Sequence, residues 1–133
     1  MKDFEVIETT ADIGLKVYGC DLRELCINLL RGFYYIVFDK NINFFAYESR
    51  GDDYSKISSS TTEELLISLL EDAIFYTYTE NTVLYPCEVT ENDLKYKLLQ
   101  NSDYIETEIK AVTRHRFGLV HDKIYTVTVI FDI

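Results

Sequence analysis

Glycine, proline and tryptophan are scarce or absent in this chain of 133 residues, which has 5 glycines, one proline and no tryptophan. The glycine-rich sequences that cradle nucleotide phosphates, G-x-x-x-x-G-K-[ST] and G-x-G-x-x-G, do not occur, and neither does the G-x-S-x-G of nucleophilic hydrolases. A phosphate-cradling loop is therefore not expected. No Ser-His-Asp or Cys-His constellation is suggested by position.

Cysteine is also sparse, and Cys20, Cys26 and Cys87 form no C-x-x-C pair. An odd number without a framework argues against a disulfide scaffold, so each is predicted to be a reduced core thiol. No run of 18 apolar residues exists, and residues 1–5 lack the basic-then-apolar pattern of a signal peptide. We therefore expect a cytoplasmic protein that does not contact a membrane.

Positive charge is in short supply: 13 basic against 23 acidic residues give a net charge of −10. Such a chain is poorly suited to nonspecific nucleic-acid binding, which needs cationic surface to displace counterions. It suits a soluble protein that meets a basic partner. The length and a hydrophobic share of 47% predict one domain over residues 1–133 with a core of its own.

Apolar residues at helical spacing predict two helices, one from Leu22 to Val37 and one from Thr62 to about Tyr78. Asp21 is a candidate N-cap for the first, and Ser60 or Thr61 for the second. The other apolar segments are predicted strands: Phe4–Glu8, Ile13–Tyr18, Phe44–Ser49, Tyr54–Ser58, Thr82–Thr90, Leu94–Leu99, Tyr104–Thr113 and Ile124–Phe131. The third and fourth read as a hairpin about residues 51–53. The predicted fold is α+β, with two layers: a largely antiparallel sheet and both helices on one face.

Two aspartates near opposite ends of the chain are candidate metal ligands. Asp12 follows a predicted strand, and Asp132 ends the last one, next to Ile133. If the two lie side by side, their side-chain carboxylates and the terminal carboxylate at Ile133 converge. The repulsion among these like charges would be relieved by a bound cation. Oxygen ligands of this kind select Ca²⁺, Mg²⁺ or Mn²⁺. From spacing alone, Asp12 reads equally as a turn aspartate and Asp132 as a solvated strand end.

Basic residues near the C-terminal third have two readings each. Lys110 shares a strand face with acidic neighbours, which is typical of a surface ion pair worth ~0–1 kcal/mol. Arg114, His115 and Arg116 form a basic patch that could meet a phosphate or an acidic partner. The same patch could simply protect an edge strand. The sequence leaves both readings open.

Four segments carry a family resemblance: T-A-D-I-G at residues 10–14, E-E-L-L at 63–66, I-K-A-V-T-x-H at 109–115 and I-F-D-I at 130–133. In this order and spacing they resemble the archease family, whose members assist RNA ligases of the RtcB type in tRNA splicing. The resemblance covers nearly the whole chain. It departs at one position, because the family usually has His before T-A-D and this chain has Thr9.

The resemblance implies a set of functional residues. Asp12, Asp132 and an oxygen of Ile133 would hold a divalent cation, Ca²⁺ or Mg²⁺/Mn²⁺. Lys110 would be a functional residue near that acidic site, and His115 matches the family's usual histidine. The absence of histidine at Thr9 would remove one contribution to the site.

The resemblance also implies a function without catalysis. Such a protein binds an RtcB-type ligase, promotes guanylylation of the ligase and allows multiple turnover, and it meets RNA only through the ligase. Two alternatives remain at this point. One is a stand-alone metal-dependent phosphoester hydrolase that uses Asp12 and Asp132. The other is a broader protein chaperone.

Overall fold

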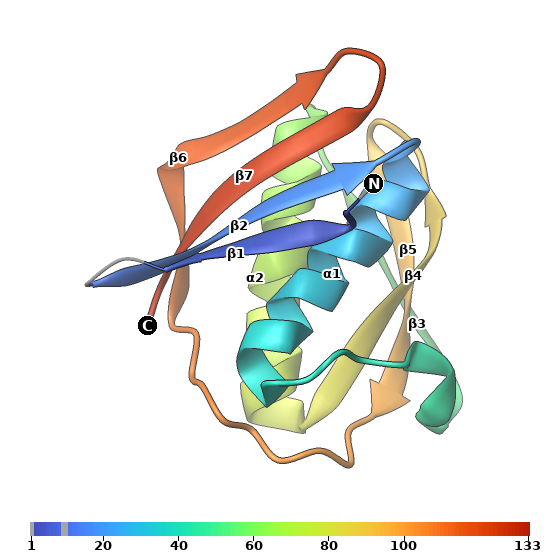
Figure 1. The fold of residues 1–133 in the computed structure, drawn as a ribbon. Coiled ribbons are helices and arrows are strands. Elements are labelled where there is room, and N and C mark those ends of the chain that lie inside the picture. Colours follow the sequence, from blue (N-terminus) through green and yellow to red (C-terminus); the bar gives the residue numbers. More distant parts are fainter. Residues whose placement is uncertain (1, 9–10) are drawn as a thin grey trace.

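The computed structural model describes residues 2–8 and 11–133, and in this part of the chain two helices lie between two antiparallel sheets (Figure 1). The elements in chain order are β1 (Phe4–Glu8), β2 (Asp12–Gly19), α1 (Leu22–Phe38), the 3₁₀ helix η1 (Phe44–Ala46), β3 (Ser49–Ser58), α2 (Thr62–Glu80), β4 (Thr82–Val89), β5 (Asp93–Gln100), β6 (Ala111–His121) and β7 (Tyr125–Asp132). The four-stranded sheet has the order β1-β2-β7-β6, and the three-stranded sheet has the order β3-β5-β4.

Both helices begin at the predicted caps. The Asp21 side chain accepts a hydrogen bond from the Glu24 amide at 2.8 Å, and Thr61 does the same for the Glu64 amide at 3.2 Å. These bonds satisfy amides that have no partner inside the helix. The C-cap residues of the two helices, Asp39 and Asn81, are both in the left-handed conformation, with φ of 55° and 52°. The predicted second helix therefore starts at the correct residue, Thr62, but its predicted end at Tyr78 is two residues before the observed end at Glu80.

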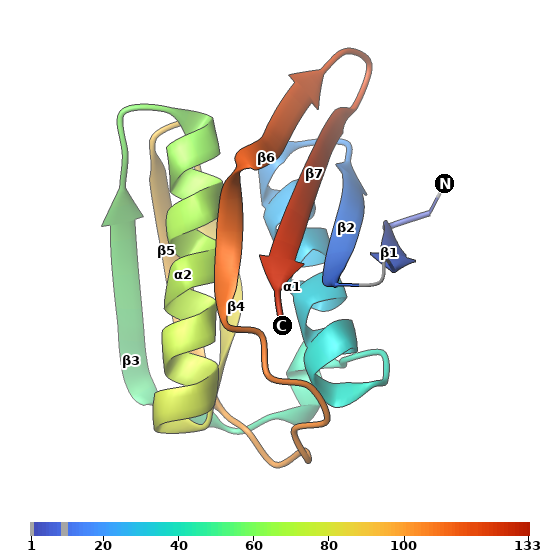
Figure 2. The same cartoon turned by 90° about the vertical axis from the view of Figure 1, so that its left-hand side faces the viewer.

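The α+β class and the antiparallel pairing are confirmed, but the strands form two sheets where one was expected. The reason is that α1 buries far more than one stripe: its buried residues are Leu25, Cys26, Asn28, Leu29, Leu30, Gly32, Phe33, Tyr34, Ile36, Val37 and Phe38. A helix that is apolar around most of its circumference needs cover on more than one side. Accordingly α1 packs on β2 and β4, one strand from each sheet (Figure 2).

Residues 44–49 do not form the first strand of a hairpin, so that prediction is wrong. Phe44 is 7% exposed and starts the 3₁₀ helix η1, with Asn43 as its cap. Strand β3 runs straight past Gly51, whose φ is +60°, with only an irregular register on β5. Gly51 thus supplies a bulge in one strand and no chain reversal.

The predicted strand Tyr104–Thr113 is also corrected, because strand pairing begins only at Ala111. Residues 104–109 do alternate between exposed and covered positions. Their amides, however, bond to helix residues: those of Glu106 and Thr107 donate to the carbonyl oxygen of Val37, at 2.7 and 3.2 Å. The segment is an extended chain that packs on helices.

The cysteines do not all lie in the core as predicted. Cys26 is buried, and burial raises the pKa of its thiol to about 12. Cys87 is half-buried, and Cys20 is exposed, where the Glu24 carboxylate raises its pKa. Among the described residues, no helix is long and apolar enough to span a membrane.

Candidate acidic site

The two candidate aspartates meet across neighbouring strands. Asp12, the first residue of β2, pairs directly with Asp132, the last residue of β7. On the other side of β7, Asp132 pairs with Ala111 of β6. Directly opposed residues have Cβ atoms ~4.5–5.5 Å apart and share a face of the sheet. The fold therefore brings together two carboxylates that the sequence places at opposite ends.

Both carboxylates belong to the face of the sheet that points away from the helices. The alternate residues of β7, Val127, Val129 and Phe131, are fully buried against the core. Strand alternation puts Asp132 on the opposite, outer face, where it is exposed. The Thr113 hydroxyl lies 3.5 Å from Asp132 Oδ1, a long and weak hydrogen bond.

Lys110 is joined to this site through its backbone, because its amide donates to the carbonyl oxygen of Asp132 at 2.8 Å. Tyr78, near the end of α2, holds the segment just before it. The Tyr78 hydroxyl donates to the carbonyl oxygen of Thr107 and accepts from the amide of Ile109, both at 2.8 Å. Nothing in the sequence around Tyr78 pointed to this role. Lys110 itself is exposed, and a functional role for it stays a prediction.

Replacing Tyr78 with Phe is expected to loosen residues 107–110. The change leaves the Ile109 amide and the Thr107 carbonyl without this partner, which costs about 1–3 kcal/mol for half-buried groups. Urea denaturation measures the loss, and hydrogen exchange at the Ile109 amide locates it. Tyr104→Phe is the matched control, since Tyr104 is 77% exposed. Equal stability of the two variants would contradict the role given to Tyr78.

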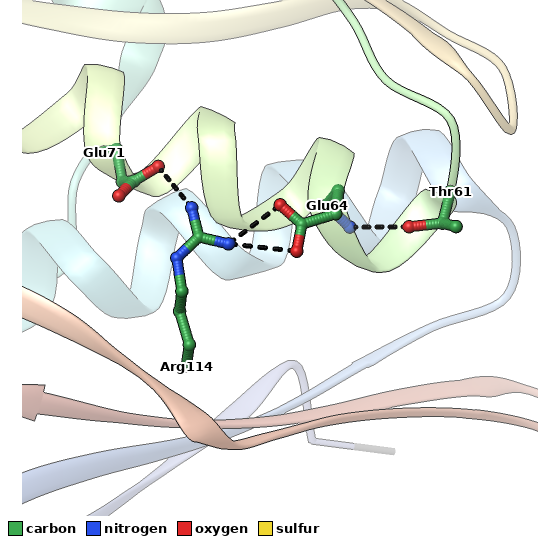
Figure 3. Close-up of polar contacts among 4 residues, drawn as sticks. All are labelled: Thr61, Glu64, Glu71 and Arg114. Carbon is green, nitrogen blue, oxygen red and sulfur yellow. Dashed lines mark hydrogen bonds and ion pairs between the residues drawn. The ribbon is translucent and has the colours of Figure 1, made fainter.

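Arg114 lies on β6, the edge strand of its sheet, and its half-exposed side chain forms ion pairs with two acidic residues of α2 (Figure 3). Its guanidinium donates to both oxygens of Glu64, at 2.8 and 2.9 Å, and to Glu71 at 3.2 Å, both residues of α2. The Glu64 carboxylate raises the pKa of Arg114. The sequence suggested that Arg114 could meet an acidic partner. In the structure its acidic partners are Glu64 and Glu71 of helix α2 in the same protein.

His115 follows Arg114 in the irregular part of β6, between Thr113 and Gly118, where the register on β7 shifts. It is exposed, and the strand pairing does not place it opposite Asp12 or Asp132. A functional role for His115 stays a prediction. Thr9 lies outside the described residues.

Carboxylate oxygens are hard donors, the ligand type that Ca²⁺, Mg²⁺ and Mn²⁺ prefer. Asp12 and Asp132 supply two carboxylates, and the exposed Ile133 follows directly. Among residues 2–8 and 11–133, no group of three or more Asp, Glu, His or Cys side chains could hold a metal ion. Two carboxylates with the chain's last residue would leave coordination positions for water or a partner. The identity of a cation, and the part played by Ile133, stay predictions.

A divalent cation is expected to stabilise the wild-type protein and to have less effect on Asp132→Asn. Like charges directly opposed on a sheet cost ~0.2–1 kcal/mol, so in EDTA the variant should be slightly more stable than wild type. Cation at a hundred times its Kd should add about 2.7 kcal/mol to wild type. Urea denaturation with and without Ca²⁺, Mg²⁺ or Mn²⁺ measures both effects. Asp122→Asn, in the β6–β7 turn, is the control, and an identical response of both variants would contradict the site.

The fold and the site define a small α+β protein with two aspartates paired on an open sheet face. The model of the Archease protein family (MTH1598/TM1083) matches residues 4–133, and the chain therefore belongs to this family. It is 26% identical to the protein archease of Thermoplasma volcanium, over 98% of each chain.

Solved structures agree with this assignment. The chain is similar to the solution structure of protein 1598 of Methanobacterium thermoautotrophicum, with a TM-score of 0.74, 25% identity and full coverage of both chains. It also resembles the crystal structure of a Thermotoga maritima protein described as an archease and a possible chaperone. There the TM-score is 0.65 at 21% identity, over 96% of this chain and 94% of the other, which supports the fold alone.

Proposed function

We propose that this protein is an accessory factor of an RtcB-type RNA ligase in tRNA splicing, which promotes guanylylation of the ligase and its multiple turnover. The observation that supports this most is the direct pairing of Asp12 with Asp132 on an open face, in a chain that belongs to the archease family. The residues act on the partner's site and perform no reaction themselves. Cytoplasmic location and assembly with the ligase are part of the same proposal.

In this proposal the acidic site brings a divalent cation to the nucleotide site of the ligase. Asp12, Asp132 and Ile133 would hold a divalent cation, which when bound supplies positive charge that offsets the charge of a nucleotide's phosphates. The backbone bond between Lys110 and Asp132 places the backbone of Lys110 next to the strand end that carries the acidic site. With a net charge of −10, the protein is electrostatically complementary to a basic substrate channel, which speeds encounter and selects orientation.

The energetic demand on such a factor is modest. It has to bind the guanylylation-competent state of the ligase more tightly than the resting state, and the difference in affinity sets the shift in population. A difference of ~3 kcal/mol changes the ratio of the two states by about a hundredfold. A few charge-assisted contacts at a desolvated rim are enough for this.

Ligation under multiple-turnover conditions, with and without this protein, tests the proposal. The RtcB-type ligase of the same organism is given excess RNA with 2′,3′-cyclic phosphate and 5′-hydroxyl ends, together with GTP and Mn²⁺. We expect turnover to continue only with the protein present, and a single-turnover reaction with pre-guanylylated ligase to need no protein. Equal turnover without it would overturn the proposal. Phosphoester hydrolysis by the protein alone would favour the hydrolase instead.

A further inference from the structure

The outer face of the three-stranded sheet gathers lysines on an otherwise acidic protein. The strand register puts Tyr54, Lys97 and Tyr85 in one row across β3, β5 and β4, and Lys56, Lys95 and Glu88 in the next. Tyr96, the residue between the two rows on β5, points the other way and bonds to Asp72 of α2. The two rows therefore face away from the helices. Tyr54, Lys56, Tyr85, Lys95 and Lys97 are called the lysine–tyrosine face below.

Two of these lysines are direct neighbours across β3 and β5, and Glu88 lies opposite Lys95 on β4. Lys56 lies directly opposite Lys95, and like charges in such a pair repel. Among the described residues, neither these two nor Lys97 forms an ion pair, and the one acid within the rows, Glu88, makes none. Lys95 Nζ instead lies over the ring of Tyr54, 4.5 Å from its centroid. The positive charge is left available to an anion from outside.

Protection of a sheet edge does not account for these lysines. Lysine on an edge strand discourages pairing with another chain. Lys95 and Lys97, however, belong to β5, which is the central strand with both neighbours in place. Edge protection therefore does not explain Lys95 and Lys97, whereas binding of an anionic ligand would explain them.

Aromatic rings surround a hollow next to the lysines. Its volume is about 370 Å³, and its lining includes Phe45, Tyr54, Tyr85 and Lys97. Phe45 is 85% exposed, with its ring centroid 5.8 Å from that of Tyr85. Arg23 of α1 donates to the Tyr85 hydroxyl at 3.1 Å, which helps to fix the position of this ring. Most of the Phe45 ring therefore lies exposed beside Lys97 and is accessible to a further stacking partner.

We propose that the lysine–tyrosine face binds single-stranded nucleic acid. An unpaired base stacks on Phe45 and Tyr85 in the hollow, and the phosphates on either side contact Lys97, Lys95 and Lys56. Alternating stacking surfaces and cationic groups are how proteins bind single strands without reading their sequence. Duplex fits less well, because its bases are already stacked on one another.

The overall charge of −10 limits the affinity and leaves the location unchanged. Long-range repulsion opposes the approach of a polyanion, and this effect weakens with salt. The local contribution has the opposite dependence, since three lysines against phosphates predict a slope of log K against log salt of about −2 for a single strand. The proposal stands on this face alone and does not depend on the acidic site or on a ligase.

Fluorescence anisotropy with a labelled 12-nucleotide oligo(U) RNA tests the proposal on the full-length protein alone. Lys97→Gln and Lys95→Gln are each expected to weaken binding severalfold and to reduce the salt slope by about 0.7. Phe45→Ala is expected to weaken binding roughly five- to hundredfold with the slope unchanged, because it removes stacking. Phe45 is exposed, so this variant should fold normally.

Two matched controls keep the result specific. Phe75→Ala removes another exposed ring, 52% accessible and on α2, and Lys123→Gln removes an exposed charge in the β6–β7 turn. Both should bind oligo(U) like wild type. Absence of binding by wild type, or equal losses in the controls, would overturn the proposal. Tighter binding of an acidic peptide or of duplex RNA than of oligo(U) would overturn it too.

Discussion

Asp12→Ala and Asp132→Ala are each expected to remove the stimulation of multiple-turnover ligation almost completely, a loss of about a hundredfold in ligase turnover. The figure follows from the proposed mechanism, in which ~3 kcal/mol of differential binding separates the two states of the ligase. Because the two carboxylates are directly opposed, either one alone is a poor cation site. The single variants and the double variant should therefore fail to a similar extent.

A control variant and stability measurements distinguish loss of function from loss of structure. Asp122→Ala removes an exposed carboxylate from the β6–β7 turn and should stimulate the ligase like wild type. Circular dichroism and urea denaturation should show all variants folded, since the aspartates lie on the outer face. Lys110→Ala should lower stimulation if its side chain takes part. Folded Asp12→Ala protein with full activity would contradict the proposed site.

Gly19→Ala is expected to be the most damaging small substitution in the fold. A Cβ on Gly19 would lie 2.5 Å from the amide nitrogen of Leu25 and 2.6 Å from its Cα, both in the backbone of the first turns of α1. Backbone cannot rotate aside as a side chain can, so β2 and α1 would have to separate. Overpacking of this kind costs about 3 kcal/mol, which lowers Tm by roughly 6–12 °C.

Gly118→Ala is the control for this prediction. Gly118 also lies in the four-stranded sheet, but an added Cβ there would meet nothing within 4 Å. Its stability should match or slightly exceed that of wild type, because alanine reduces the entropy of the unfolded chain. Thermal denaturation of the two variants side by side measures the contrast. Similar Tm values would show that α1 can move away from β2 at little cost.

Local signals in the sequence predicted the helices well. The apolar spacing and the caps Asp21 and Thr61 depend only on neighbouring residues, so α1 and α2 begin where expected. Residues 104–110 show the limit of the same reasoning. Alternation of apolar and polar residues reports an extended chain with one covered side, and here helices provide the cover. Periodicity cannot distinguish that cover from a neighbouring strand.

Partners far apart in sequence were beyond prediction from residue patterns. The meeting of Asp12 and Asp132 was expected only through the family resemblance, because strand pairing between distant segments leaves no local trace. The ion pairs of Arg114 with Glu64 and Glu71 depend on the packing of β6 against α2. The position of Tyr78 under residues 107–109 depends on where α2 ends. Such contacts are set by tertiary structure.

The place of β7 has a consequence for the newly made chain. It follows both β2 and β6 in the sequence, yet it lies between them in the folded sheet. Until β7 is in place, β2 and β6 each lack the strand that joins them in the sheet. Closing such long sequence separations is slow. The pairing of Asp12 with Asp132 therefore exists only after β7 has been made and has joined β2, so the acidic pair marks a folded four-stranded sheet.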